Sequence, residues 1–273
     1  MSKLFINALV LLLIGLFATS PALAEPSSQL DIIKKRGVFI VGFAPDAPPM
    51  GSIGADGAAS GFAPDLARAV AHDLHVDVRF KPITGALLIP AIRNGEIDAM
   101  FASTTPTQAR EEVLDFTIVY NWDSVVPLVR AGESGVISDY KPPKKVATTK
   151  NNYAAQLFTS AVPGGNVVFF DQYDDAVNAL RAKQVDAVLL NRFSATTYAK
   201  RYNNTLKVGD SFFSDPQAIV VHQNDSRWRN YLNWTLQRVW ARGEFASLYE
   251  KNFGYKPQFS LWSATRLQPG ITP

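Results

Sequence analysis

The segments NGEIDAMFAS (residues 94–103) and AKQVDAVLLN (residues 182–191) carry most of the information about the fold, because they repeat one pattern. In each segment a helix ends, an acidic residue and an alanine follow, and an apolar strand stops at a polar residue. A chance similarity between two ordinary β/α units is the alternative. If the similarity is real, Ser103 and Asn191 end equivalent strands in two similar lobes. Ligands of open α/β sheets bind beyond the carboxyl ends of strands, so both residues would then face one cleft.

On both sides of these segments, short β-branched runs alternate with amphipathic helical stretches. This alternation predicts an α/β fold with mostly parallel sheets and covering helices. The expected strands are 38–43, 76–83, 98–103, 146–149, 167–170 and 185–191. The expected helices are 64–74, 87–94, 152–162, 173–183 and 227–242, with a final helix that ends at Gly254.

One further helix has a clear predicted start at residues 105–108. Thr105 is suited to cap a helix, Pro106 suits the first helical position, and Gln108 completes a capping box. Helix N-termini bind anions through their free backbone N–H groups. We therefore expect an anion site near Thr105.

The N-terminus has the layout of a secretory signal peptide. Lys3 precedes an almost entirely apolar run over residues 5–18, and Pro-Ala-Leu-Ala at 21–24 offers a small-x-small cleavage site. A retained membrane anchor is the alternative, but the run is shorter than the roughly 20 residues that a span needs. We expect residues 1–24 to be removed and the protein to be exported to the periplasm.

Composition excludes several kinds of partner and cofactor. The formal net charge is only +3, which gives no electrostatic basis for binding nucleic acid. Cysteine is absent, so disulfides and thiolate metal sites are impossible. The three histidines, His72, His75 and His222, are scattered, and no Ser-His-Asp arrangement is legible. We expect no metal and no cofactor.

A series of short motifs in order resembles a known family, the periplasmic amino-acid-binding proteins of ABC transporters (solute-binding protein family 3). The most specific motif is Ser103-x-Thr105-x-Thr107-x-x-Arg110, followed by Asp115-Phe116. The others are Val41-Gly42 with Pro48-Pro49, Gly61-Phe62-Ala63-Pro64-Asp65-Leu66, Leu88-Ile89-Pro90-Ala91-Ile92, Gly95-x-Ile97-Asp98-Ala99, Val185-Asp186-Ala187-Val188 and Tyr249-Glu250-Lys251-Asn252-Phe253-Gly254. The resemblance covers nearly all of residues 29–254.

The resemblance implies a two-lobed periplasmic-binding-protein fold of type II, with mixed, mostly parallel sheets and a hinge of two crossing segments. Extended segments near 120–126 and 215–220 are the expected hinges. Lobe one would comprise residues 25–122 and 219–254, and lobe two residues 123–218. Residues 255–273 would form a tail whose aromatic residues Tyr255, Phe259 and Trp262 pack on lobe one, with a contact surface for a partner as the alternative.

The family also implies roles for individual residues. Those that match Ser103, Thr105 and Arg110 hold the α-carboxylate of the ligand. A planar guanidinium suits this role, because it can donate two parallel hydrogen bonds to a carboxylate. Without the family pattern, a surface ion pair of Arg110 with Glu111 or Asp115 would be the favoured interpretation.

Several positions depart from the family pattern, and they bear on the ligand. Asn191 stands where an aspartate usually pairs with the α-ammonium of the ligand, so we expect Asn191→Asp to improve binding of free amines. Ala44 replaces a common aspartate. Ala47 and Gly85 replace aromatic residues. Together these changes predict a roomier pocket that is less suited to a cationic ligand, and hence a carboxylate with a weak, substituted or absent amine, or a bulky amino acid that is held differently. Asp46 and Trp122 are possible replacements for the missing ammonium partner.

On lobe two, Asn152 and Tyr153 open a helix. They offer donors and a ring to a ligand, or Asn152 simply caps the helix.

We therefore expect a monomeric periplasmic component of an ABC importer that binds an amino acid or related small carboxylate and docks on a membrane permease. The expected ligand-binding residues are Asp46, Ser103, Thr105, Arg110, Asn152, Tyr153 and Asn191. An enzyme similar to cyclohexadienyl dehydratase is the alternative on the same fold. It needs an acid in lobe two, whereas the strand end reads Asn191-Arg192-Phe193-Ser194-Ala195.

Overall fold

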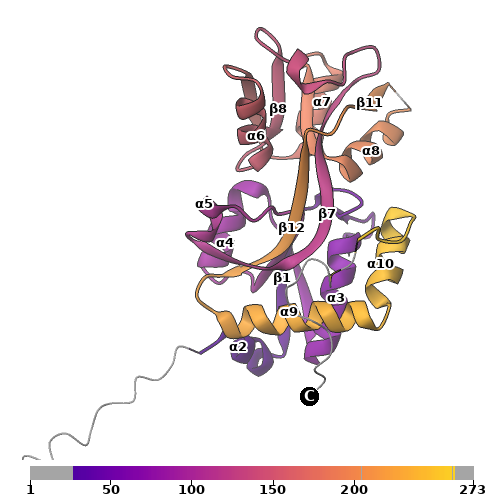
Figure 1. The fold of residues 1–273 in the computed structure, drawn as a ribbon. Helices are drawn as coiled ribbons and strands as arrows, with labels where there is room; N and C mark the ends of the chain where they lie inside the picture. Colours follow the sequence, from indigo (N-terminus) through magenta and orange to yellow (C-terminus); the bar gives the residue numbers. More distant parts are fainter. Residues whose placement is uncertain (1–26, 204, 260, 262–273) are drawn as a thin grey trace, which may run out of the picture.

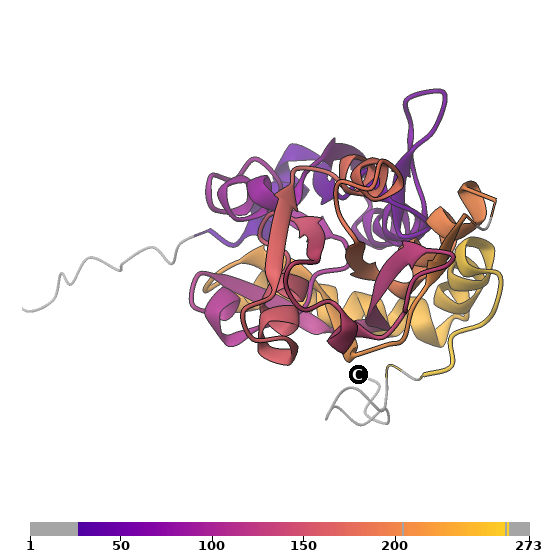
Figure 2. The same cartoon turned by 90° about the horizontal axis from the view of Figure 1, so that it is seen from above.

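A computed structural model describes residues 27–203, 205–259 and 261 of the chain. Two α/β lobes lie one above the other and are joined by two long antiparallel strands, β7 (Leu114–Arg130) and β12 (Phe213–His222) (Figure 1). Seen from above, helices lie on both sides of the strands (Figure 2). The predicted signal peptide lies outside the described residues. None of the helices in the described ranges is long and apolar enough to cross a membrane.

Lobe one is built on a parallel core of three strands. Its strands are β5 (Asp77–Pro82), β1 (Val38–Phe43) and β6 (Ala99–Phe101), in that order, and β12 follows beside β6 in the antiparallel direction. Its helical segments are α2 (Gln29–Arg36), α3 (Phe62–Leu74), η1 (Gly85–Leu87), α4 (Leu88–Arg93), α5 (Gln108–Glu111), α9 (Ser226–Ala241) and α10 (Glu244–Phe253). A small separate sheet of β2 (Asp46–Ala47), β3 (Gly51–Ile53) and β4 (Ala59–Ser60) precedes α3.

Lobe two repeats this design on the other side of β7. The sheet continues with β10 (Ala187–Asn191), β8 (Lys145–Thr149) and β9 (Asn166–Phe170), and β11 (Leu206–Val208) also pairs with β7. The helical segments are η2 (Ile137–Asp139), α6 (Tyr153–Ala161), α7 (Tyr173–Arg181) and α8 (Arg192–Arg201). The strands β10, β8 and β9 are parallel, so the alternation of strands and helices correctly predicted an α/β fold of mixed, mostly parallel sheet.

The sheet is continuous between the lobes because β7 and β12 belong to both. Their pairing runs from Leu114 opposite His222 to Val125 opposite Phe213, with irregular register near Ala218. The predicted lobe boundaries at residues 122 and 218 fall inside these strands and stay a prediction.

The two repeated segments of the sequence fold alike. After α4, Glu96 N donates to Ala91 O at 2.9 Å, and after α7, Gln184 N donates to Ala179 O at the same distance. Gly95 and Lys183 turn the chain with φ of 67° and 61°. The similarity of these segments is therefore real in three dimensions.

The acidic residues of the two segments also make equivalent hydrogen bonds. The backbone N–H of Asp98 donates to Ile40 O (2.8 Å), and Asp98 Oδ2 accepts from Ile40 N (2.6 Å). Asp186 makes the same pair of bonds with Lys145, at 2.7 and 2.8 Å. Each acid thus ties the start of its strand to the neighbouring parallel strand, and Arg36 and Arg130 each form an ion pair with one of the two acids.

Aromatic side chains fill the core of lobe one and reach the other lobe. Phe62 of α3 lies 5.3 Å from Phe253 and 5.4 Å from Tyr249 between ring centroids. Phe193 of α8, in lobe two, stacks at a tilt on Phe253 at 4.4 Å. Phe259 packs on Tyr249 at 5.9 Å. The aromatic tail thus packs on lobe one as far as Phe259, and Trp262 lies outside the described residues.

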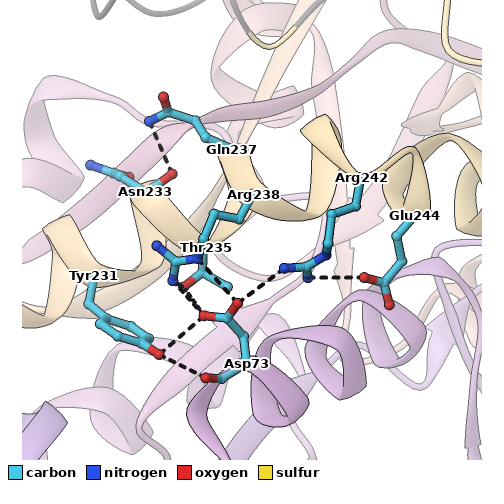
Figure 3. Close-up of polar contacts among 8 residues, drawn as sticks. All are labelled: Asp73, Tyr231, Asn233, Thr235, Gln237, Arg238, Arg242 and Glu244. Carbon is cyan, nitrogen blue, oxygen red and sulfur yellow. Dashed lines mark hydrogen bonds and ion pairs between the residues drawn. The ribbon is translucent and has the colours of Figure 1, made fainter. Parts of the chain in front are cut away.

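A polar cluster fastens α9 to α3 on the outer side of lobe one. The carboxylate of Asp73 accepts from Thr235 Oγ1 (3.1 Å), from Arg238 Nε (3.2 Å) and Nη2 (2.5 Å), and from Arg242 Nη1 (3.4 Å) (Figure 3). Partial burial alone would raise the pKa of Asp73, but hydrogen bonds and charge from Arg238, helped by Thr235 and Arg242, lower it to about 2. The carboxylate is therefore ionised at neutral pH and holds the two helices together.

One predicted helix start is wrong. The helix α5 begins at Gln108 and its cap is Thr107, whose hydroxyl accepts from Arg110 N at 3.3 Å. The hydroxyl of Thr105 instead donates to Asp215, 110 residues away in sequence. The helix α5 is only four residues long, so the anion site expected from a capped helix at Thr105 is not formed.

Candidate functional site

A cavity of about 110 Å³ lies where the two lobes meet. It is lined from lobe one by the loop after β1, η1, and the segment from β6 to α5, and from lobe two by the loops after β8, β9 and β10. All seven predicted site residues are among those that line it: Asp46, Ser103, Thr105, Arg110, Asn152, Tyr153 and Asn191. Their roles toward a ligand stay a prediction.

Arg110 places a positive charge in the cavity. Its Nη1 donates to Thr105 O and its Nη2 to Asn151 O in lobe two, both at 2.8 Å. Asp115, one of the partners considered from the sequence, pairs with Arg229 at 3.2 Å instead. No ion pair of Arg110 occurs among the described residues. Burial lowers the pKa of Arg110, but a guanidinium keeps its charge in proteins. The site therefore holds a cation whose partners are neutral carbonyl oxygens.

Asp215, on β12, places a carboxyl group in the same cavity. Its side chain accepts hydrogen bonds from Thr105 Oγ1 (2.5 Å), Asn191 Nδ2 (2.5 Å) and Gln217 Nε2 (3.1 Å). The residue is 2% exposed, and burial raises its pKa. From the sequence, Asp215 was expected only to begin a hinge segment. An acid at the start of a mostly apolar extended segment was the one available signal.

Thr105 links the two charged residues. Its carbonyl oxygen accepts from Arg110 and its hydroxyl donates to Asp215. A hydroxyl has a single donor hydrogen, so the hydroxyl of Thr105 can donate to a ligand carboxylate only by giving up its bond to Asp215. Ser103 follows the end of β6 and lines the cavity beside it.

On lobe two, Asn152 and Asn191 have structural partners as well as positions in the cavity wall. Asn152 caps α6, because its side chain accepts from Ala154 N at 2.8 Å, and its Nδ2 donates to the hydroxyl of Tyr173 at 2.5 Å. Asn191 ends β10 and donates to Asp215 rather than capping α8. Tyr153 lies edge-to-face with Phe213 at 5.9 Å.

Asp46 connects the lobes at the N-terminus of α7. Its carboxylate accepts from Tyr173 N (2.5 Å), and its carbonyl oxygen accepts from the hydroxyl of Tyr198 (3.0 Å). Burial raises the pKa of Asp46, while the bond from Tyr173 opposes this shift. Trp122, the other possible replacement for an ammonium partner, is 42% exposed and is not among the cavity-lining residues.

The expected extra room at Gly85 is absent. A Cβ at this position would lie 2.7 Å from the carbonyl oxygen of Lys150, so the backbone of lobe two fills the space that a side chain would occupy. Ala44 and Ala47 do line the cavity with small side chains. The lobes are therefore in close contact around a small cavity, and the interpretation of a roomier pocket fails at Gly85.

A second, partly buried acid lies in the hinge strands. Asp123 of β7 is directly opposite Asp215 in the strand pairing. Its side chain accepts from Ser124 N (2.6 Å) and from Phe193 N (3.4 Å) at the start of α8. Burial raises the pKa of Asp123 to about 7, and the charge of Asp215 adds to this shift.

Comparisons with known proteins identify the family and similar folds. Residues 39–255 match the model of the bacterial extracellular solute-binding proteins, family 3. The chain is 26% identical over 228 residues to the L-cystine-binding protein TcyJ of Escherichia coli (strain K12), covering 82% of this chain and 86% of that protein.

Two solved structures are also similar. An ancestral arginine-binding protein bound to glutamine has a TM-score of 0.76 and 32% identity, covering 80% of this chain and 99% of that one. An ancestral amino acid-binding protein, described as a precursor of cyclohexadienyl dehydratase, has a TM-score of 0.76 and 28% identity, covering 83% of this chain and all of that one.

Proposed function

Because the chain belongs to the bacterial extracellular solute-binding proteins, family 3, and so has a substrate-binding role, we propose that it binds an amino acid or related small carboxylate between its two lobes. It then delivers this ligand to the membrane permease of an ABC importer. The proposal includes its location in the periplasm and its action as a monomer. The related proteins named above bind L-cystine, arginine and glutamine, which supports an amino acid as the class of ligand.

The observation that carries the proposal is the charge of Arg110 inside the cavity. Its guanidinium bonds only neutral carbonyl oxygens, one from each lobe. A ligand carboxylate that takes their place gains charge-assisted hydrogen bonds of about 1.5–3 kcal/mol each. Such a ligand therefore stabilises the arrangement in which the lobes meet.

Closure of the lobes around the ligand follows from the contacts between them. Asp46 of lobe one accepts from Tyr173 N of lobe two, and Arg110 reaches Asn151 across the same gap. These bonds form only when the lobes are together, so a ligand that binds both lobes shifts the equilibrium toward the closed state. The strands β7 and β12 are the connections about which the lobes move.

We propose binding without turnover. The end of β10 carries Asn191, and a carboxamide cannot act as a general acid. Asp215, the buried acid of the cavity, is held as the acceptor of three hydrogen bonds, and these oppose the rise in its pKa that burial causes. Conversion of prephenate or arogenate by the purified protein would contradict this part of the proposal.

The test is a binding screen of the protein and of two arginine variants. A ligand at about 100 times its Kd adds about 2.7 kcal/mol to the free energy of unfolding, which a thermal-shift assay detects. We expect L-cystine, L-glutamine or L-arginine to give such a shift. Arg110→Ala should weaken binding by about 100- to 10,000-fold, the equivalent of two charge-assisted bonds.

Arg93→Ala is the matched control, because Arg93 is exposed on α4 and does not line the cavity. It removes the same charge and should leave affinity unchanged. Equal affinity of the Arg110→Ala variant and the unchanged protein would refute the role of Arg110 in holding a carboxylate.

A further inference from the structure

The charged residues that line the cavity are not all paired. They are Asp46, Arg110, Lys150, Asp171 and Asp215. Lys150 and Asp171 form an ion pair at 2.8 Å, and Asp46 accepts from a backbone N–H at the start of α7. Among the described residues, neither Arg110 nor Asp215 takes part in an ion pair. One cation and one anion are thus left facing the cavity.

Neutral groups fix the carboxylate of Asp215 in place. Thr105, Asn191 and Gln217 each donate one hydrogen bond to it. Gln217 is itself held by Asn121, whose Nδ2 donates to Gln217 Oε1 at 2.8 Å. Amide and hydroxyl donors orient a carboxylate but do not neutralise its charge, and a buried charge without an opposite charge is costly. This arrangement is suited to an ion that arrives with the ligand.

We propose that Asp215 binds the positively charged amino group of the ligand, so that the cavity takes a zwitterion with its ammonium beside Asp215 and its carboxylate beside Arg110. The assignment of the carboxylate rests on the proposed function. Thr105 contacts both poles, since its hydroxyl bonds Asp215 and its carbonyl oxygen bonds Arg110. The two charges are therefore close enough to serve the two ends of an α-amino acid, in which the ammonium and the carboxylate share one carbon atom.

This assignment changes the expected effect of Asn191→Asp. The Nδ2 of Asn191 lies 2.5 Å from Asp215 Oδ2, so the substitution puts a second carboxyl group against the first. Two carboxyl groups at this distance retain a proton between them rather than both ionising. Asn191→Asp alone therefore adds little negative charge, and the improvement predicted from the sequence should not occur.

The experiment compares ligands that differ only in the α-amino group. The pairs are L-glutamine with glutaramate, L-arginine with 5-guanidinopentanoate, and L-cystine with 3,3′-dithiodipropionate. Isothermal titration measures each Kd for the unchanged protein, Asp215→Asn, Asn191→Asp and the double variant Asn191→Asp/Asp215→Asn. We expect the unchanged protein to favour the amine of at least one pair by about tenfold or more.

In Asp215→Asn, the Kd of the compound with the amine should rise by about 10- to 100-fold. The Kd of its partner without the amine should stay the same or fall. The double variant returns one carboxylate to the same pair of side chains and should recover much of the preference. A purely structural role of Asp215 predicts instead that both members of a pair lose affinity equally, and that result would overturn the inference.

The comparison of compounds with and without an amine tests the role of Asp215 even if Asp215→Asn does not fold. An unchanged protein that binds both members of every pair equally well overturns the role of Asp215 without any variant. If that binding still depends on Arg110, only this inference fails. If none of the six compounds binds, or if Arg110→Ala binds them equally well, the proposed function fails with it.

Discussion

Replacing Asp73 by asparagine should destabilise lobe one in a way that depends on pH. The carboxylate of Asp73 bonds Arg238 and Arg242 of α9, and its pKa is lowered from 3.8 to about 2 in the folded protein. An acid whose pKa is lowered by folding stabilises the protein above its unfolded pKa. This contribution is complete above about pH 5, declines below 3.8, and is lost as the pH falls through about 2.

The size of the effect follows from the pKa difference and from exposure. A shift from 3.8 to about 2 corresponds to a ceiling of about 2.5 kcal/mol. The side chains of Arg238 and Arg242 are 44% and 46% exposed, so water screens much of their attraction. We therefore expect Asp73→Asn to cost about 1 kcal/mol at pH 7.

Urea unfolding followed by tryptophan fluorescence measures this cost at pH 7 and pH 3. The difference between the unchanged protein and Asp73→Asn should fall to about half at pH 3, because the unfolded chain is then largely protonated at this position. It should also shrink at 1 M salt. Asp31→Asn is the matched control, because the Arg227–Asp31 pair is exposed and should contribute under about 0.5 kcal/mol. A cost for Asp73→Asn that is the same at both pH values would refute the electrostatic reasoning.

Two further predictions concern closure and the hinge. Gly85→Ala places a methyl group 2.7 Å from Lys150 O, so it should hold the lobes apart and weaken ligand binding. The melting temperature without ligand should stay unchanged. Gly132→Ala, whose methyl group meets nothing within 4 Å, is the control and should leave ligand affinity unchanged. Asp123→Asn should stabilise the protein by more than about 1 kcal/mol at pH 8 but not at pH 4. Its folded pKa of about 7 exceeds the unfolded value of 3.8, so the unchanged protein loses stability as the pH rises between them. Thermal unfolding at both pH values measures this, and a benefit at pH 4 as large as at pH 8 would contradict it.

Elements with strong local signals could be predicted from the sequence. The strand at 38–43 has the predicted bounds, and α7 begins at the predicted Tyr173. The repeated segments were informative because each holds a complete local unit of helix end, turn, acid and strand. The helix α8 was not predicted, since its sequence RFSATTYAKR buries only Ser194, Ala195 and Tyr198 and has no clear apolar face.

Features that depend on distant partners could not be predicted in this way. Thr105 and Thr107 are equally suited to cap a helix, and a contact of Thr105 with Asp215 decides between them. Asp215 itself enters the site only because β12 pairs with β7 and brings it beside Asn191. The glycine at position 85 predicted extra room in the pocket, but the backbone of the other lobe occupies that space.

The position of β12 in the sheet has a consequence for the order of folding during synthesis. In the sheet β12 lies between β6 and β7, although the strands β8 to β11 and the helices of lobe two precede it in the chain. At about 5–20 residues per second, a ribosome needs on the order of ten seconds to pass from β6 to β12. Throughout that time the edge of β6 that later pairs with β12 has no partner, and an unpaired strand edge can pair with other chains. The strands β8 to β11 and the helices of lobe two follow β7 consecutively, so they can fold before β12, the last strand of lobe one, has been synthesised.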